Sequence, residues 1–288
     1  RDRGLVKWDC GRMESKSEQN EWSSGVWAHL TDVRRRSPLV QCITNFVSMD
    51  LVANTLLSAG ASPAMVHSVV EIPDFTPHIH ALCINVGTLT PEWLPSMKAA
   101  AEVASQLGKP WVLDPAAVSC SGFRLKSCLE LIGLKPTVIK GNGSEIIALS
   151  SASPGQTKGA DSSHESTDAI EAAKSLALSS GAVVAVSGAV DIVTDGNQVI
   201  GVHNGTKMMQ KITATGCSLA GLIAAFLAID SSRPLEATVS AMSVFGIAGE
   251  LGEAMANGPA SLRMHLIDSL YGLDETSVRS RVNITRFG

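Results

Sequence analysis

The stretch ALCINVGTLTPEWLPSMKAAAEVASQLGKPWVLD, residues 81–114, sets the structural pattern of this chain. Its first six residues form an apolar run with the length of a buried strand. Residues 91–107 begin with proline and are followed by Gly108, the punctuation typical of a helix. The last four residues form a second apolar run, which ends in Asp114. This order predicts two parallel strands joined by a crossover helix.

The same alternation continues on both sides of that stretch. Apolar runs at 39–43, 137–140 and 182–186 predict further strands. Helical spacing occurs at 46–59, 125–132, 142–149, 167–178, 217–229 and 234–256. Asp195-Gly196-Asn197, between two apolar runs, predicts a late antiparallel hairpin. The sequence therefore predicts an α/β fold with a mainly parallel central sheet and helices on both faces.

Composition excludes several classes of protein. The 288 residues are 45% hydrophobic and 17% charged, which suits a sizeable core, and the net charge of -4 favours neither nucleic acid nor an anionic membrane surface. No apolar run reaches the ~18 to 20 residues that a membrane span needs. The six cysteines include no C-x-x-C pair, so a zinc site has no support and a reducing compartment is expected.

The N-terminal residues give little structural signal. Residues 1–12 show no periodicity, and Met13 is a plausible start. This region has no signal-peptide apolar segment and is too acidic for a typical transit peptide, so we expect a cytosolic (cytoplasmic) protein. We expect residues 1–24 to form a poorly ordered tail and residues 25–288 to form a single domain.

Residues 211–221, KITATGCSLAG, lead directly into a strongly apolar segment. A helix that begins among such small residues points its unpaired N–H groups outward, and these groups with the helix dipole form an anion site. Cys217 would lie in the first helical turn, where a thiolate is held more easily than in a free cysteine. Taken alone, Cys217 is as well explained as a small core residue of a buried helix.

Polar residues end the predicted strands, and ligands of open α/β sheets bind at that edge. Asp114 could hold Mg²⁺ or cap a turn. Asn142 and Glu145 could face one side of a helix start together or form a capping box. Lys140 could meet a phosphate or be solvated, and Ser187 could approach a phosphate or form a turn. Together with the anion site, this set is what phosphoryl transfer requires, since its catalysis is mainly positioning and charge neutralisation.

The common nucleotide-binding motifs are missing from the sequence. It contains no G-x-x-x-x-G-K-[ST] loop and no G-x-G-x-x-G after a strand. Other ordered motifs are present: PLVQCITN (38–45), GASPAM (60–65), NVGTL (85–89), LDP (113–115), KGNGSEI (140–146), VSGAVD (186–191) and ITATGC (212–217). In this order they resemble the hydroxyethylthiazole kinase family, a thiamine-pathway family of the ribokinase-like superfamily, from about residue 25 onward.

The resemblance implies ATP- and Mg²⁺-dependent phosphorylation of the primary hydroxyl of 4-methyl-5-(2-hydroxyethyl)thiazole. It implies that Asn45, Met65, Ala214 and Gly216 bind the thiazole. It also places Cys217 nearest the substrate hydroxyl, as a base or as a positioning group.

On the nucleotide side, the resemblance implies that Lys140 and Ser187 contact ATP phosphates. It implies that Asp114 and Glu145 organise Mg²⁺. The family further implies a homotrimer with active sites at the subunit interfaces.

Three positions depart from the family pattern. Alanine stands at 214, where glycine is common, so a positive φ there would strain the chain. Lys140 stands where arginine is common, which keeps the charge and loses the bidentate fork. Residues 114–117, DPAA, lack the glycine often found after this Asp-Pro.

Three other functions stay open from the sequence. The chain could phosphorylate another small alcohol, such as a pyrimidine or vitamin precursor. It could bind a nucleotide or sense a metabolite without catalysis, which the departures at Ala214 and Lys140 would favour. It could also be a dehydratase of a hydrated nicotinamide cofactor, although Cys217 stands where such an enzyme would need an acidic group.

Overall fold

The predicted strands are present in a computed structural model, which describes residues 16–152 and 165–287. The strands are β1 (Leu39–Ile43), β2 (Ser62–Ala64), β3 (Ala81–Asn85), β4 (Trp111–Asp114), β5 (Val138–Asn142), β6 (Val183–Ser187), β7 (Asp191–Thr194), β8 (Val199–Val202) and β9 (Ile284–Phe287).

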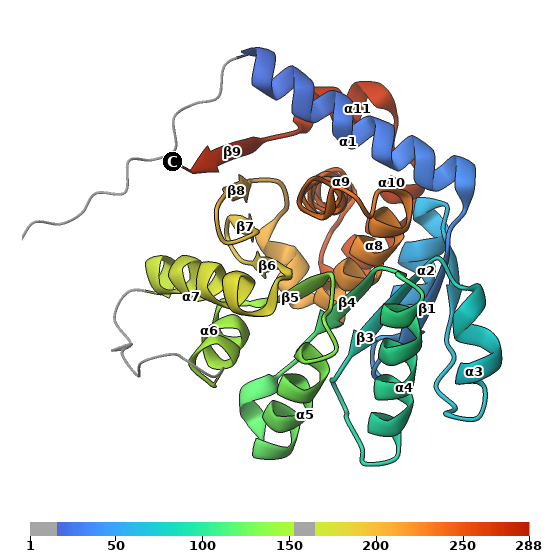
Figure 1. Ribbon diagram of the computed structural model, residues 1–288. Coiled ribbons are helices and arrows are strands. Elements are labelled where there is room, and N and C mark those ends of the chain that lie inside the picture. The colour runs from blue at the N-terminus through green and yellow to red at the C-terminus, as the bar shows by residue number, and fades with distance from the viewer. Residues whose placement is uncertain (1–15, 153–164, 288) are drawn as a thin grey trace, which may run out of the picture.

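Helices connect these strands and dominate the last third of the chain (Figure 1). No helix of the described part is both long enough and apolar enough to cross a bilayer. The helices are α1 (Lys16–Arg36), α2 (Met49–Ala59), α3 (Ile72–Phe75), α4 (Trp93–Gln106), α5 (Gly122–Ile132), α6 (Gly143–Ala152), α7 (Glu165–Ser180), α8 (Thr215–Ile229), α9 (Pro234–Met255), α10 (Pro259–Gly272) and α11 (Glu275–Arg281), with short 3₁₀ turns η1 (Thr76–His78), η2 (Val118–Cys120) and η3 (Lys207–Lys211).

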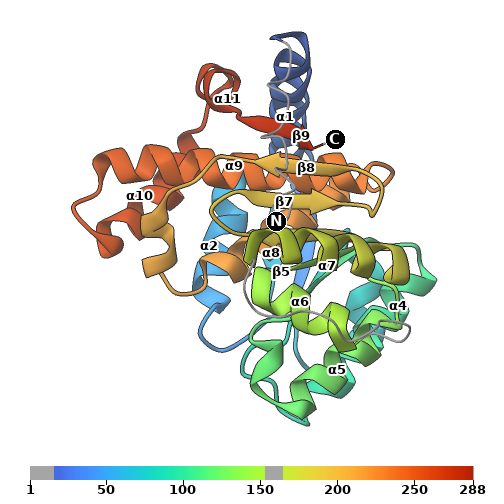
Figure 2. The same ribbon diagram turned by 90° about the vertical axis from the view of Figure 1, so that its left-hand side faces the viewer.

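The strands of the described residues form one nine-stranded sheet in the order β2-β1-β3-β4-β5-β6-β7-β8-β9. The pairs from β2 to β6 are parallel, whereas β7, β8 and β9 add antiparallel strands, and β7 and β8 lie beside α9 (Figure 2). Gly196 takes a φ of 95° in the β7–β8 turn, which glycine adopts without strain. The predicted mainly parallel sheet with helices on both faces is confirmed.

Alternate strand residues face two separate apolar cores. In β3, Leu82 and Ile84 pack into the cluster that contains residues of α4, α5 and α7. Ala81 and Cys83, which alternate with them in sequence, pack into the cluster that contains residues of α2, α8 and α9. Both faces of the strand are thus buried, as its continuous apolar sequence indicated.

Helix α1 begins at Lys16, inside the stretch expected to be a poorly ordered tail. Residues 16–24 are therefore helical, and the rest of the expected tail lies outside the described residues. The helix packs against α8, α9 and α11 through Val26, Leu30 and Val33, all buried. Helix α6 reaches Ala152 and α7 begins at Glu165, while residues 153–164 lie outside the described part.

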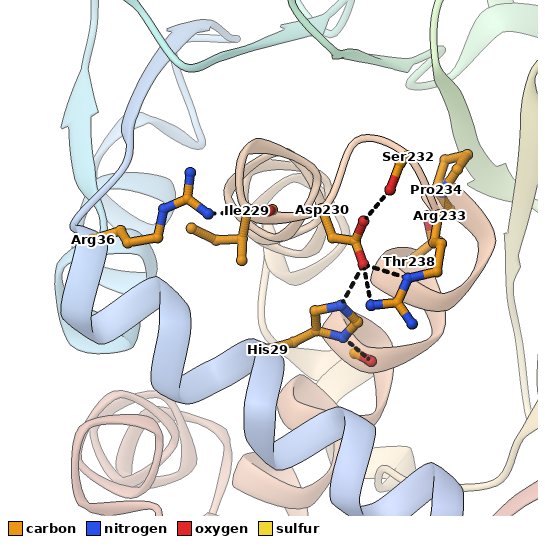
Figure 3. A network of polar contacts seen from close by, with 9 residues as sticks. His29, Arg36, Ile229, Asp230, Ser232, Arg233, Pro234 and Thr238 are labelled. Carbon is orange, nitrogen blue, oxygen red and sulfur yellow. Dashed lines mark hydrogen bonds and ion pairs between the residues drawn. The ribbon is translucent and has the colours of Figure 1, made fainter.

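A polar network joins α1 to the turn between α8 and α9 (Figure 3). His29 Nε2 lies 3.2 Å from Asp230 Oδ2, and Arg233 Nε donates to the same oxygen at 2.8 Å. Ser232 Oγ donates to Asp230 Oδ1 at 2.8 Å, and His29 Nδ1 lies 2.9 Å from Ser240 Oγ. Burial would raise the pKa of Asp230, but the hydrogen bonds from Ser232, His29 and Arg233 outweigh it and lower the pKa to about 2.

This network predicts a stability loss in Asp230→Asn. A carboxyl whose folded-state pKa is below its ordinary value stabilises the fold above that ordinary pKa, and the stabilisation disappears as the pH falls through about 2. The variant should lower the free energy of unfolding by about 1–2 kcal/mol at pH 7, measured by urea denaturation, because solvent screens part of the interaction. The control Asp32→Asn removes an exposed partner of Arg35 and should change it by less than about 1 kcal/mol. Equal stability of Asp230→Asn and the wild type at pH 7 would contradict the prediction.

Candidate active site

The parallel strands end at one edge of the sheet, and α8 begins at that same edge. Asn45 follows β1, Asn85 ends β3 and Asp114 ends β4, and their register places Asn85 directly beside Asp114. Cys217 lies in the first turn of α8, within hydrogen-bond reach of both asparagines. Residues far apart in the sequence thus meet because the strands are parallel.

Asn85 is the centre of this cluster, with only 1% of its surface exposed. Its Nδ2 donates to Asp114 Oδ2 at 2.6 Å and lies 3.2 Å from Cys217 Sγ. Its Oδ1 accepts from Asn45 Nδ2 and from the backbone N–H of Gly87, both at 2.8 Å. Asn45 Nδ2 also lies 3.4 Å from Cys217 Sγ. These contacts use the full hydrogen-bonding capacity of the Asn85 amide.

The Cys217 thiol differs from its sequence-based prediction. Burial, and then the nearby Asp114 carboxylate, raise its pKa above the ordinary value, and the hydrogen bonds from Asn45 and Asn85 and the charge of Lys140 do not offset them. The expected ease of forming a thiolate is therefore wrong. Position at a helix start favours the anion, but removal from water and a neighbouring negative charge disfavour it more strongly.

Asp114 and Glu145 form an electrostatically coupled pair of carboxyl groups. Burial raises the pKa of Asp114 to about 6, the charge of Lys140 opposes this rise, and the charge of Glu145 adds to it. Glu145 Oε1 accepts from the Ala117 N–H at 2.8 Å and Oε2 accepts from the Asn142 N–H at 2.7 Å. Because the Asn142 side chain accepts from the Glu145 N–H at 2.9 Å, these two residues do form a capping box.

The donor set suits Mg²⁺ bound partly through water. Residues 16–152 and 165–287 contain no group of three or more His, Cys, Asp or Glu side chains that could hold a metal ion. Mg²⁺ needs only one or two carboxylates, because it keeps several waters and phosphate oxygens as ligands. A divalent cation would also relieve the repulsion between Asp114 and Glu145, and each carboxylate oxygen keeps a free lone pair.

Lys140 brings a buried positive charge to the start of α8. Its side chain is only 3% exposed, and within the described residues it has no hydrogen bond or ion pair. Its Nζ lies 3.0 Å from the place where a Cβ on Gly216 would stand, so a side chain at position 216 would displace the ammonium by a few tenths of an ångström. Burial also raises the pKa of Asp191 to about 6, against a hydrogen bond from the Gly188 N–H and the Lys140 charge.

The remaining predicted residues, Ser187 and Met65, also follow or end strands of the parallel part of the sheet, but they make fewer polar contacts than Asn85 and Glu145 do. Ser187 ends β6 beside Asn142, and its Oγ donates to the Gly141 carbonyl at 3.4 Å. Met65 follows β2, the edge strand, and borders the apolar cluster that Cys217 also borders. The sequence analysis did not name Asn85 as a site residue. Asn85 ends an apolar strand just as Asp114 does, and a polar residue at that position was the signal that could have identified it.

Two alanines near the site adopt the left-handed conformation. Ala214, the residue before α8, has a φ of 70°, and Ala117, in the loop after Asp114, has a φ of 54°. The strain expected at position 214, where glycine is common in the family, is therefore present. In the loop after Asp114-Pro115, which lacks the family's glycine, Ala117 likewise has a positive φ.

The backbone at position 214 predicts a stabilising substitution. The left-handed conformation costs a non-glycine residue about 1–2 kcal/mol, and glycine loses about 0.5–1 kcal/mol more entropy on folding. Ala214→Gly should therefore raise the free energy of unfolding by up to about 1 kcal/mol, measured by chemical denaturation. Ala228→Gly, inside α8, is the matched control and should lower it by about 1 kcal/mol. Similar losses in both variants would show that Ala214 is unstrained.

Comparison with known proteins places this geometry in a family. The profile of the "Hydroxyethylthiazole kinase family" matches residues 30–276. The chain is 92% identical over 276 residues to a hydroxyethylthiazole kinase of Arabidopsis thaliana. The alignment covers 96% of this chain and 100% of that protein. It is 60% identical over 280 residues to a hydroxyethylthiazole kinase of Zea mays, over 96% of this chain and 99% of that protein.

Solved structures agree with these relatives. A hydroxyethylthiazole kinase protein from Pyrococcus horikoshii OT3 superposes with a TM-score of 0.86 at 38% identity, over 92% of this chain and all of the other. A pyridoxal kinase from Staphylococcus aureus shares the fold alone, with a TM-score of 0.57 at 19% identity, over 76% of this chain and 90% of the other. The predicted ribokinase-like architecture is confirmed. The chain belongs to the hydroxyethylthiazole kinase family.

Proposed function

We propose that this chain transfers the γ-phosphoryl group of ATP to the primary hydroxyl of 4-methyl-5-(2-hydroxyethyl)thiazole, in thiamine biosynthesis or salvage. The observation that carries the proposal is Lys140, a largely buried residue whose ammonium forms no hydrogen bond or ion pair with the described residues and faces the start of α8 at Gly216. A buried charge of this kind is costly unless an anion accompanies it. A phosphate group supplies that anion.

The nucleotide side of the site combines three kinds of positive potential. The Lys140 ammonium, the unpaired N–H groups at the start of α8 and the α8 dipole all favour a phosphate there. Ser187, at the end of the neighbouring strand β6, adds a hydroxyl donor. In the proposed complex, Lys140 and Ser187 contact ATP phosphates, and the backbone of residues 214–217 holds the transferring group.

Asp114 and Glu145 would hold Mg²⁺ together with phosphate oxygens and water. When bound, the ion neutralises charge on the ATP phosphates. Glu145 has a second task, because its hydrogen bonds to Ala117 and Asn142 hold the loop after Asp114 against the start of α6.

Asn45, Met65, Ala214 and Gly216 would surround the thiazole, with its hydroxyl near Cys217. The alcohol oxygen forms a bond to the γ-phosphorus, and the bond from that phosphorus to the departing ADP oxygen breaks. The alcohol proton passes to solvent water. The raised pKa of Cys217 favours a thiol that positions the alcohol over a thiolate that removes its proton.

The decisive assay measures ADP and thiazole phosphate by mass spectrometry after mixing the protein, ATP, Mg²⁺ and the thiazole alcohol. The wild type should form both products and need Mg²⁺. A panel of pyrimidine and vitamin-precursor alcohols tests the alternative substrates. Tight ATP binding without turnover of any alcohol would refute the proposal and favour a nucleotide-binding sensor.

Asp114→Asn should separate function from stability. Because the folded-state pKa of Asp114 is about 6, the wild type loses stability as the pH rises from about 4 to about 6, and the variant does not. The variant should therefore be at least as stable as the wild type at pH 7.5 in thermal melts without Mg²⁺, and its kcat should fall about 100-fold or more. Full activity of Asp114→Asn would remove this residue from the metal site.

We also propose a homotrimer whose subunit interfaces enclose the active sites. Phe46 and Val47, which follow Asn45 directly, are 64% and 59% exposed, and Val70 in the loop after β2 is 79% exposed. Large apolar side chains beside a ligand pocket are typical of a surface that another subunit covers. A cytosolic location also stays a prediction, which cell fractionation tests.

Light scattering after size-exclusion chromatography tests the trimer. The wild type should elute with the mass of three chains, and Phe46→Ser should shift the population toward single chains while the circular dichroism spectrum stays unchanged. Leu178→Ser is the matched control, because Leu178 is 64% exposed on α7. A single-chain mass for the wild type would contradict the proposal.

A further inference from the structure

Backbone groups fix the orientation of the Asn85 side-chain amide. The N–H of Gly87 lies 2.8 Å from one of its terminal atoms, and a backbone N–H can only donate. That terminal atom must therefore be the oxygen. The amide NH₂ then points the other way, where Asp114 Oδ2 lies at 2.6 Å and Cys217 Sγ at 3.2 Å.

The same reasoning fixes the Asn45 amide. The backbone N–H of Val47 donates to Asn45 Oδ1 at 3.1 Å, so the opposite terminal atom must be nitrogen. This nitrogen lies 2.8 Å from Asn85 Oδ1 and 3.4 Å from Cys217 Sγ. Two N–H donors, each set by a separate backbone group, therefore converge on one sulfur atom.

A sulfur atom that accepts from two amides must direct its own hydrogen elsewhere. The Cys217 side chain is only partly buried, and the proposed function places the substrate hydroxyl near it. We propose that Asn85 is a positioning residue that orients Cys217 as a hydrogen-bond donor to the substrate hydroxyl oxygen. This inference rests on the proposed placement of the thiazole alcohol.

The surroundings of Asn85 explain why an asparagine suits this position. Its two donors connect Asp114 to Cys217, and its oxygen holds Asn45 and Gly87. A carboxylate at position 85 would face the Asp114 carboxylate, and a serine would be too short to span all four partners. A Cβ on Gly87 would lie 2.7 Å from Asn45 Nδ2 and 2.9 Å from Asn85 Oδ1, so the network also excludes a side chain there.

The first experiment measures the pH dependence of Cys217 alkylation by iodoacetamide, followed by peptide mass spectrometry. Asn85→Ser removes a donor that lowers the thiol pKa, so the alkylation midpoint should move to higher pH. Asn85→Ala removes the same donor without adding a charge and should shift the midpoint in the same direction, which covers a failure of Asn85→Ser to fold. The exposed Cys120 is an internal reference whose midpoint should not change.

The matched control is Asn204→Ser. Asn204 is another buried asparagine with a saturated amide NH₂, which donates to Glu250 Oε1 and to the Arg281 carbonyl at 3.0 and 2.8 Å. Its loss should lower stability without moving the Cys217 midpoint. If Asn85 had only a structural role, Asn85→Ser would likewise lower stability and leave the Cys217 alkylation midpoint unchanged.

The second experiment is a double-mutant cycle with Cys217→Ala. Asn85→Ser should lower kcat about 10- to 100-fold with little change in the KM for ATP. In the Cys217→Ala background, its effect on kcat should be at least about three-fold smaller, because the residue through which it acts is gone.

The outcomes separate the two proposals. An unchanged alkylation midpoint, or kcat effects that multiply independently in the cycle, would overturn the positioning role of Asn85. No turnover by the wild type would overturn the proposed function, while the alkylation midpoint would still test whether Asn85 acts on Cys217.

Discussion

The positive charge of Lys140, which forms no ion pair within the described parts of the chain, is the constraint on which this edge of the sheet depends. It lies close enough to Asp114 and Asp191 to oppose the effect of burial on both carboxyl groups, yet it forms an ion pair with neither. A glycine at position 216 keeps the space in front of it open. An ammonium held in this way can form a close ion pair when an anion binds, and this favours the binding of a phosphate.

The site also contains backbone strain. Ala214 and Ala117 both have positive φ values, one at the start of α8 and the other in the loop after Asp114. Neighbouring structure holds them there: α8 continues directly from Ala214, and Glu145 accepts a hydrogen bond from the Ala117 N–H. Strain of this kind persists where surrounding contacts determine the conformation, and in this protein it shapes the two loops that face the proposed phosphate site.

Local patterns predicted the regular parts of the fold well. The apolar runs that became β3 and β4 are buried on both faces, so their sequences carry a strong signal. Two elements gave weaker signals: α1, whose buried Val26, Leu30 and Val33 have helical spacing but stand in a largely polar sequence, and β9, a short edge strand of mixed composition. The thiolate prediction for Cys217 failed because position in a helix is a local property, whereas burial and the charge of Asp114 are not.

By itself, the sequence determined the order of strands and helices, the family, and which residue types stand at the strand ends. Those features depend on neighbours within a few residues, where periodicity and turn chemistry act. Only the tertiary structure decided that Asn45, Asn85 and Cys217 share one hydrogen-bonded cluster, and that Lys140 forms no hydrogen bond or ion pair with the residues the structure describes. These contacts join distant segments, and burial removes the water that would otherwise screen their charges, so their strength depends on the folded surroundings.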